Sequence, residues 1–209
     1  MIRRVLLSIT FLLTLGLTLS ASAQVKTLPF NSKAIPQGLK VKGEIEHGLH
    51  WVDRAGEHYL LFSSITKTKK TDHSEITSSY LYATHYRLKN KQVKLVRTLR
   101  DRNENCEFEK ITRFNHKSSS VTDLDHNGLA ETTFVYYLGC SNDLSPIDAK
   151  LALLENGQKY MIRGETTLIY PGGMKEGGSY KVDPSLLKAP NVFLEHALKV
   201  WKAQTVWNH

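Results

Sequence analysis

Oxygen-bearing side chains alternate along one short stretch of the chain, V-T-D-L-D-H-N-G-L-A-E, which begins at Val121. The acids and the amide stand at positions one, three and five of a nine-residue frame, a glycine follows them, and a glutamate ends the frame. Calcium is bound in proteins by about six to eight such oxygens at about 2.3–2.6 Å, and a backbone carbonyl can serve at position seven. The spacing predicts a calcium site formed by Asp123, Asp125, Asn127, Leu129 and Glu131.

Two other interpretations of this stretch are weighed against a calcium site. An EF-hand would need a glutamate at position twelve, where Phe134 stands, so that motif is excluded. Asn127-Gly128 can also form an ordinary hairpin turn with the acids as turn formers. The nine-residue frame resembles the calcium loops of FG-GAP/VCBS-type β-propeller repeats, in which D-x-D-x-D/N-G-x-x-D/E links two strands. That resemblance implies a structural calcium ion, although Asn127 in place of a third aspartate lowers the ligand charge.

Two cysteines, Cys106 and Cys140, flank this stretch and are the only cysteines in the chain. An even number of cysteines in an exported protein favours a disulfide over free thiols. The bridge would close a loop around the acidic stretch and brace it. The alternative, a catalytic thiol with a histidine partner, has no local motif to support it.

Basic side chains are concentrated between residues 87 and 102, and on alternating strands several of them would share one solvent-facing surface. In an exported protein such a surface would meet an acidic glycan, a phosphate-bearing lipid or an envelope protein rather than nucleic acid, and no base-stacking aromatic pattern accompanies the run. A solvated surface without a partner is the alternative. The predicted anion-binding residues are Arg87, Lys89, Lys91, Lys94, Arg97 and Arg100.

The N-terminus has the pattern of a secretory signal peptide over residues 1–23. Arg3 and Arg4 precede an apolar run, and Ala21-Ser22-Ala23 forms a small-x-small cleavage pattern. A membrane anchor is the alternative, but the apolar run is shorter than the about 20 residues that span a bilayer, and no later run is long enough. Because residues 1–23 contain two arginines and no acid, the formal charge falls from +8 to +6 on cleavage. We therefore predict a periplasmic or secreted protein.

Short apolar–polar alternations, separated by turn residues, predict a mainly β fold with antiparallel sheets. Asn156-Gly157 is the clearest two-residue hairpin turn. Apolar residues at helical spacing predict one C-terminal α-helix over about 190–206, packed on the sheet. Residues 24–40 are predicted to be a flexible leader and 66–79 an exposed loop, with a single β-rich domain over 41–209. A repeated outline, an Asp- and Gly-containing turn followed by an aromatic strand at 51–62 and 122–137, is consistent with propeller-like blades.

No motif for nucleophilic, zinc or phosphate-loop chemistry is present: the chain lacks G-x-S-x-G, H-E-x-x-H and a Gly-rich loop followed by Lys-Ser/Thr. His47 and His50 are close in sequence, but no third ligand stands at a recognisable spacing. No residue is therefore assigned a catalytic role.

The order of landmarks from residue 106 to 164 resembles a family of small exported bacterial proteins loosely linked to surface polysaccharide. The landmarks are C-E-F-E, T-D-L-D-H-N-G-L-A-E, Y-Y-L-G-C-S-N-D-L-S-P and K-L-A-L-L-E-N-G-Q-K-Y-M-I-R-G. The resemblance implies an envelope role and brings no catalytic residue. We expect a non-catalytic exported envelope protein, stabilised by calcium, that binds an anionic glycan or a protein partner. The alternatives are an enzyme acting on envelope polysaccharide and an inhibitor or immunity-type protein.

Overall fold

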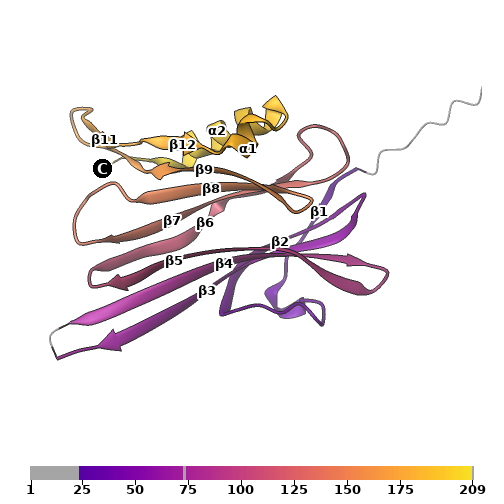
Figure 1. Cartoon of the computed structure of the whole chain (residues 1–209), viewed down its shortest axis with the longest axis horizontal. Coiled ribbons are helices and arrows are strands. Elements are labelled where there is room, and N and C mark those ends of the chain that lie inside the picture. The colour runs from indigo at the N-terminus through magenta and orange to yellow at the C-terminus, as the bar shows by residue number, and fades with distance from the viewer. Residues whose placement is uncertain (1–23, 73, 209) are drawn as a thin grey trace, which may run out of the picture.

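Two five-stranded antiparallel sheets lie against each other, and a helix covers the outer face of one of them (Figure 1). The structure is a computed structural model that describes residues 24–72 and 74–208, so the predicted signal peptide lies outside the described residues. Strand order is β1-β2-β3-β4-β5 in sheet A and β12-β9-β8-β7-β6 in sheet B, and a small third sheet has the order β11-β10-β13. The prediction of a mainly β, antiparallel fold with a C-terminal helix is confirmed, whereas the blade-like interpretation stays a prediction.

Most strands of each sheet follow one another along the chain. Sheet A consists of β1 (Lys26–Leu28), β2 (Glu44–Asp53), β3 (Gly56–Lys70), β4 (Glu75–Lys89) and β5 (Gln92–Cys106). Sheet B consists of β6 (Glu109–Thr122), β7 (Glu131–Ser141), β8 (Asp148–Glu155), β9 (Gln158–Glu165) and β12 (Tyr180–Val182). The remaining elements are the 3-10 turn η1 (Ser32–Ala34), β10 (Thr167–Ile169), β11 (Lys175–Gly177), the helices α1 (Pro184–Leu187) and α2 (Asn191–Thr205), and β13 (Val206–Asn208).

The main core lies between the sheets. Because side chains alternate across a strand, every second residue of β3 and β4 faces sheet B, and these positions carry Leu60, Phe62 and Leu81. The ring of Phe62 lies 4.9 Å from the rings of both Phe114 and Phe134 of sheet B, measured between centroids. Each fully buried side chain of this size contributes roughly 1.5–3 kcal/mol through burial.

The C-terminal helix packs on the opposite face of sheet B. Phe193, Ala197 and Trp201 stand four residues apart and form one stripe, and all three are buried against side chains such as Leu151. The observed helix, Asn191–Thr205, lies within the predicted range of about 190–206. Its apolar face is occupied by sheet B, so simple core packing accounts for its pattern. No helix in the described part of the chain is both long and apolar enough to cross a membrane.

The N-terminal segment differs from the predicted flexible leader. Within residues 24–40, β1 pairs with β2, and the side chains of Phe30, Ile35 and Leu39 pack on the outer face of sheet A around Tyr59 and Tyr86. The sequence suggested a loose segment because its apolar residues have no period. They are nevertheless half-buried, because they pack on the apolar outer face of sheet A and cover it.

Most of the polar stretch 66–79, predicted to be an exposed loop, is instead strand: residues 66–70 are the end of β3 and 75–79 the start of β4. The strands remain in register from Thr66 opposite Ser79 to Lys70 opposite Glu75. Residues 66–70 are exposed, so no apolar alternation marks them. The paired strands are joined there by backbone hydrogen bonds although the β3 half has no buried face, and such pairing leaves no pattern in the hydropathy of the sequence.

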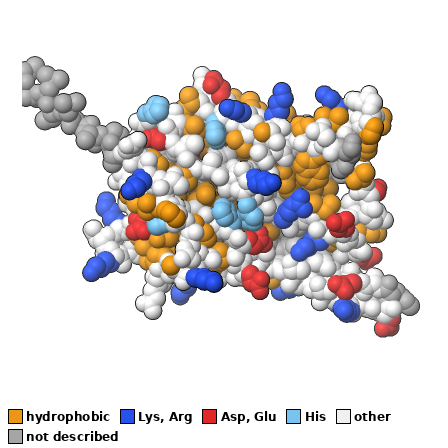
Figure 2. Space-filling model, turned by 180° about the vertical axis from the view of Figure 1, so that it is seen from behind, with side chains coloured by type: hydrophobic (Ala, Val, Ile, Leu, Met, Phe, Trp, Pro, Cys, Tyr) orange, Lys and Arg blue, Asp and Glu red, His pale blue; other side chains and the backbone are white. Residues whose placement is uncertain are grey.

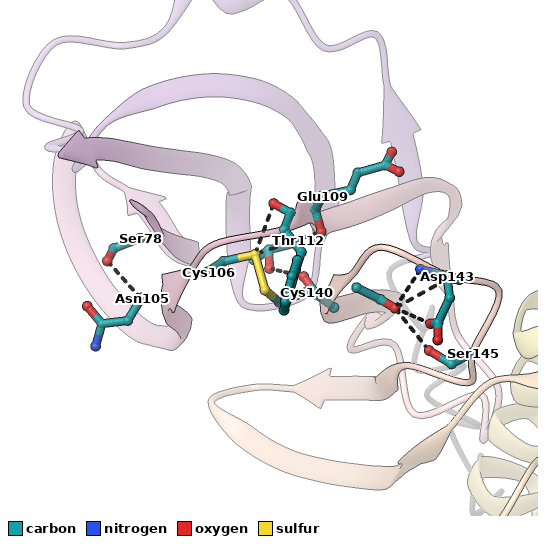
Figure 3. Close-up of a disulfide and its surroundings, with 11 residues drawn as sticks. Ser78, Asn105, Cys106, Glu109, Thr112, Cys140, Asp143 and Ser145 are labelled. Atoms are coloured by element: carbon teal, nitrogen blue, oxygen red, sulfur yellow. Dashed lines mark hydrogen bonds between the residues drawn. A yellow bond between two sulfur atoms is a disulfide. The ribbon is translucent and has the colours of Figure 1, made fainter. Parts of the chain in front are cut away.

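Cys106 and Cys140 form the predicted disulfide (Figure 3), with an S–S distance of 2.11 Å. Cys106 ends β5 in sheet A, and Cys140 lies near the end of β7 in sheet B. The bridge therefore joins the two sheets beside the point where the chain passes from one to the other.

Candidate functional site

The acidic stretch forms the connection between β6 and β7, and its carboxylates converge. Oxygen atoms of Asp123, Asp125 and Glu131 all lie within 4.8 Å of one another. Two oxygens bound to one calcium ion at about 2.5 Å can be at most about 5 Å apart, so one ion can contact all three carboxylates. This is the one group of three potential metal-ligating His, Cys, Asp or Glu side chains within residues 24–72 and 74–208.

Glu131 is the unusual member of this acidic triad, because it is fully buried. Its Oε2 accepts hydrogen bonds from the Leu124 N–H at 2.8 Å and the Thr122 hydroxyl at 3.2 Å, whereas its Oε1 has no partner among the described residues. Burial raises the pKa of Glu131 to about 7, the hydrogen bond from Leu124 opposes this shift, and the charges of Asp125 and Glu155 reinforce it. A buried carboxylate oxygen without a partner carries a free-energy cost that a bound cation would remove.

Both ends of the Asn127 amide form hydrogen bonds within the loop and to β8. Its amide nitrogen donates to Asp125 Oδ2 at 2.9 Å and to Glu155 Oε1 at 2.6 Å. Its amide oxygen accepts from the Leu129 N–H at 2.7 Å, so that oxygen serves the backbone of the turn. Of the five predicted ligands, the structure brings together the three carboxylates, while Asn127 and Leu129 close the turn. A short asparagine side chain satisfies the turn locally, which sequence spacing does not reveal.

Glu155 is an acid of this site that the sequence did not suggest. It ends β8 and stands opposite Glu131 in the register of β7 and β8. Only strand pairing brings it to the loop, since it follows the frame by more than twenty residues. Within the described residues, no lysine or arginine forms an ion pair with Asp123, Asp125, Glu131 or Glu155. The loop therefore concentrates negative charge without an ion-pairing lysine or arginine among the described residues.

Asp53, at the end of β2, joins this loop to sheet A. Its Oδ2 accepts a hydrogen bond from the Ala130 N–H at 3.1 Å, and the neighbouring Arg54 N–H donates to the Gly128 carbonyl at 3.1 Å. The two turns with a similar sequence outline, at 53–56 and 123–131, are thus in direct contact. These two hydrogen bonds join the acidic loop to the β2–β3 turn.

A chain of buried polar groups continues from Asp53 into the main core. His58 Nε2 lies 3.0 Å from Asp53 Oδ1, and His58 Nδ1 lies 2.9 Å from His85 Nε2. The Trp51 indole N–H donates to Asp53 Oδ2 at 3.2 Å, and the Trp51 ring stacks on the His58 ring. Burial, followed by the nearby His58, lowers the pKa of His85 to about 3, so His85 is neutral in the folded protein.

The pKa of Asp53 is lowered to about 2. Burial by itself would raise it, but hydrogen bonds from His58, Ala130 and Ala55 outweigh that effect. Asp53 is therefore a buried, charged acceptor at the contact between sheets. Its role is to hold that contact.

The six predicted anion-binding residues do not form one surface. Arg87, Lys89 and Lys94 line a small hollow of about 210 Å³ at the tip of the β4–β5 hairpin, and Lys91 is exposed in the turn. Arg97 instead donates its Nε–H to the Gly157 carbonyl of sheet B at 2.6 Å. On the face shown in Figure 2, lysine and arginine side chains are scattered among neutral and acidic ones.

The sixth residue, Arg100, lines a different depression on the outer face of sheet A, with a volume of about 450 Å³. Two further cations, Lys40 and Lys42, lie in its wall. Both lysines lie between β1 and β2, far in sequence from the basic run of residues 87–102, so that run did not suggest them.

A cleft of about 440 Å³ beside β9 and β12 carries charges of both signs. Its acids are Asp148, Glu165 and Asp183, and its cations are Lys150, Arg163 and Lys181. Arg163 forms an ion pair with Asp183, and Lys150 with Asp101 at 2.6 Å. The cleft is therefore close to neutral and selects for neither sign of ligand charge.

Comparison with known proteins identifies no relative: no protein-family model, no curated protein and no solved structure matches the chain.

Proposed function

We propose that the protein is a non-catalytic exported envelope protein, in which a calcium ion bound in the acidic loop braces the two sheets and a basic surface binds an anionic glycan. The observation that carries the calcium site is the buried Glu131, whose unpartnered Oε1 belongs to a triad of carboxylates within 4.8 Å of one another. The N-terminal sequence pattern and the Cys106–Cys140 disulfide support export, because disulfides persist in oxidising compartments.

Asp123, Asp125 and Glu131 would hold the ion. All three present carboxylate oxygens, which are the ligands that hard cations such as calcium prefer, and no sulfur or imidazole is among them. The ion would neutralise part of the charge that these acids and Glu155 concentrate. It would also join the end of β6 to the start of β7.

The role of the ion would be structural. The same loop is hydrogen-bonded to Asp53 and Arg54 of the β2–β3 turn. An ion that fixes the loop would therefore also fix the contact between sheet A and sheet B, at the opposite end of β7 from the disulfide.

Thermal unfolding with calcium and with chelator tests this site. At a calcium concentration one hundred times the dissociation constant, binding to the folded state alone adds about 2.7 kcal/mol of stability. For a domain of this size we expect the melting temperature to rise by about 5–10 °C. Identical unfolding curves with calcium and with chelator would contradict the proposal.

Glu131→Gln separates calcium binding from general stability. The substitution keeps the shape of the side chain and removes its charge, so the variant should lose the calcium-dependent rise in melting temperature. In chelator at pH 8 it should be more stable than the wild type, because the folded-state pKa of Glu131, about 7, lies above its ordinary value of 4.5, so wild-type stability falls as pH rises from about 4.5 to about 7. Glu107→Gln, at an exposed acid outside the loop, is the matched control and should keep the full calcium response.

The charge of the chain supports an anionic partner. With residues 1–23 removed the formal charge is +6, and an excess of this sign favours association with anionic surfaces. A protein partner is the second possibility within the same class of function, and an acidic glycan is the one that the chemistry of the outer face of sheet A favours.

A further inference from the structure

The outer face of sheet A carries a preformed groove whose lining differs from the rest of the basic surface. Three segments form it: residues 40–42 before β2, the outward-facing side chains of β4, and the middle of β5. Its volume of about 450 Å³ lies within the range of small-molecule sites. The groove residues are Lys40, Val41, Lys42, Tyr82, Thr84, Tyr86, Leu95, Thr98 and Arg100.

The charge of this outer groove has one sign. Lys40, Lys42 and Arg100 are its only charged residues. No carboxylate in the described part of the chain is within ion-pair distance of any of these three cations. The Lys42 ammonium lies 5.9 Å from the centroid of the Tyr82 ring, which directs its charge toward the groove floor. Charge complementarity therefore calls for an anionic occupant.

The floor of the outer groove offers hydroxyl groups and an apolar surface together. Thr84 and Thr98 stand opposite each other on β4 and β5, and neither hydroxyl has a hydrogen-bond partner among the described residues. Beside them Leu95 leaves 53% of its surface exposed, and the Tyr82 ring forms part of the lining. A sugar ring presents hydroxyls at its rim and C–H groups on its faces, so both parts of this floor have a counterpart on it.

The wall of the outer groove is held in place before any ligand arrives. The Tyr86 hydroxyl donates to the Lys40 carbonyl and accepts from the Lys40 N–H, and the Ser63 hydroxyl donates to the Lys42 carbonyl at 2.8 Å. Gly43 has φ +78°, and a Cβ there would lie 2.0 Å from the Ser64 carbonyl oxygen, so only glycine allows the bend that follows the wall. A fixed wall lowers the ordering cost of binding.

We propose that this outer groove is a binding site for an acidic saccharide, with Lys42 and Arg100 at the carboxylate or phosphate of the sugar and the Thr84–Thr98 pair at its hydroxyls. The proposal rests on the proposed function, since it names the site and the ligand class of the anionic glycan. The proposed binding surface is therefore not the hairpin tip with Arg87, Lys89 and Lys94. It is the groove of Lys40, Lys42 and Arg100, of which only Arg100 was among the predicted anion-binding residues.

Calorimetric titration with tetragalacturonate, in buffer without added calcium, tests the site. Its fully methyl-esterified form is the neutral control with the same sugar rings. We expect the acid to bind and the ester to bind at least roughly tenfold more weakly, because an ester no longer pairs with the cations. Lys42→Gln and Arg100→Gln should each weaken binding of the acid by roughly five- to tenfold. Thr84→Val should weaken binding of both the acid and the ester. Lys89→Gln, at the hairpin tip, should bind as the wild type does.

The outcomes separate this inference from the proposed function. Binding of tetragalacturonate that Lys89→Gln weakens and Lys42→Gln does not would keep the glycan-binding function and overturn the groove. No binding to the wild type would overturn both for acidic saccharides, while leaving the calcium result untouched. Inorganic phosphate and vesicles of phosphatidylglycerol in phosphatidylcholine are further probes. If the vesicles compete with tetragalacturonate and bind more tightly, the ligand is a lipid headgroup and the saccharide assignment is wrong.

Discussion

Asp53→Asn should destabilise the protein by an amount that depends on pH in a defined way. Asp53 Oδ1 lies 2.7 Å from the Ala55 nitrogen and 3.0 Å from His58 Nε2, while Oδ2 lies 3.2 Å from Trp51 Nε1 and 3.1 Å from the Ala130 nitrogen. Asparagine keeps the shape of the side chain but has one oxygen. In either orientation, its amide nitrogen takes the place of an oxygen that now meets two nitrogens, so the contact between the β2–β3 turn and the acidic loop is weakened.

The size of the effect follows from the pKa of Asp53, which is lowered from 3.8 to about 2. Each tenfold change in proton affinity corresponds to about 1.4 kcal/mol, so the charged carboxylate contributes about 2.5 kcal/mol to the free energy of unfolding. Because the folded-state pKa lies below the unfolded one, this contribution is present in full above about pH 5, about half remains near pH 3, and it is lost as pH falls through 2.

Urea unfolding of the wild type and Asp53→Asn at pH 7, 5 and 3 measures the difference. The gap in unfolding free energy should be about 2.5 kcal/mol at pH 7 and pH 5 and about half as large at pH 3. Asp72→Asn changes an exposed acid and should shift stability by less than about 0.5 kcal/mol at every pH. A gap below about 1 kcal/mol at pH 7, or one that does not shrink at pH 3, would refute the assigned role of Asp53.

Two further predictions concern the braces of the fold. Replacing both Cys106 and Cys140 by serine should lower the free energy of unfolding by about 3–4 kcal/mol, because the bridge spans 34 residues of sequence. Urea unfolding measures the loss. Reductant should lower the stability of the wild type and leave that of the variant unchanged. Phe193→Ala should cost about 3–5 kcal/mol by opening a cavity between α2 and sheet B, while Val192→Ala, on the more exposed side of the same helix, should cost far less in the same assay; equal losses would contradict the packing described for α2.

The sequence by itself determined the class of the fold and its strongest local features. Compact apolar runs identified β3 and β7, and the Asn156-Gly157 turn identified the β8–β9 hairpin. The spacing of Phe193, Ala197 and Trp201 identified α2, because burial of one face of a helix imposes a period on the chain. Cysteine parity predicted the disulfide. The Asp-rich frame predicted that Asp123, Asp125 and Glu131 would converge, because residues so close in sequence have few ways to separate within one turn.

Segments whose apolar residues have no regular spacing could not be predicted from the sequence in this way. The leader packs on sheet A because that face needs a cover, and residues 66–79 pair because backbone groups satisfy one another regardless of side-chain polarity. Glu155 enters the acidic loop through strand register, and Asp53 reaches Ala130 across 77 residues. These contacts depend on which strands become neighbours.

The residues that line the outer groove are likewise brought together only by tertiary structure. Lys40 and Lys42 line the same groove as Arg100, because residues 40–42 lie over sheet A and the chain bends at Gly43. A register shift between His85 and Tyr86 places Leu95 on the outer face with Thr98, although the two are an odd number of residues apart, and leaves Arg97 bonded to sheet B. A one-residue slip reverses the face of every side chain beyond it. The number of cations on β4 and β5 is therefore known from the sequence, whereas the face of the sheet that each one occupies depends on the register of the folded strands.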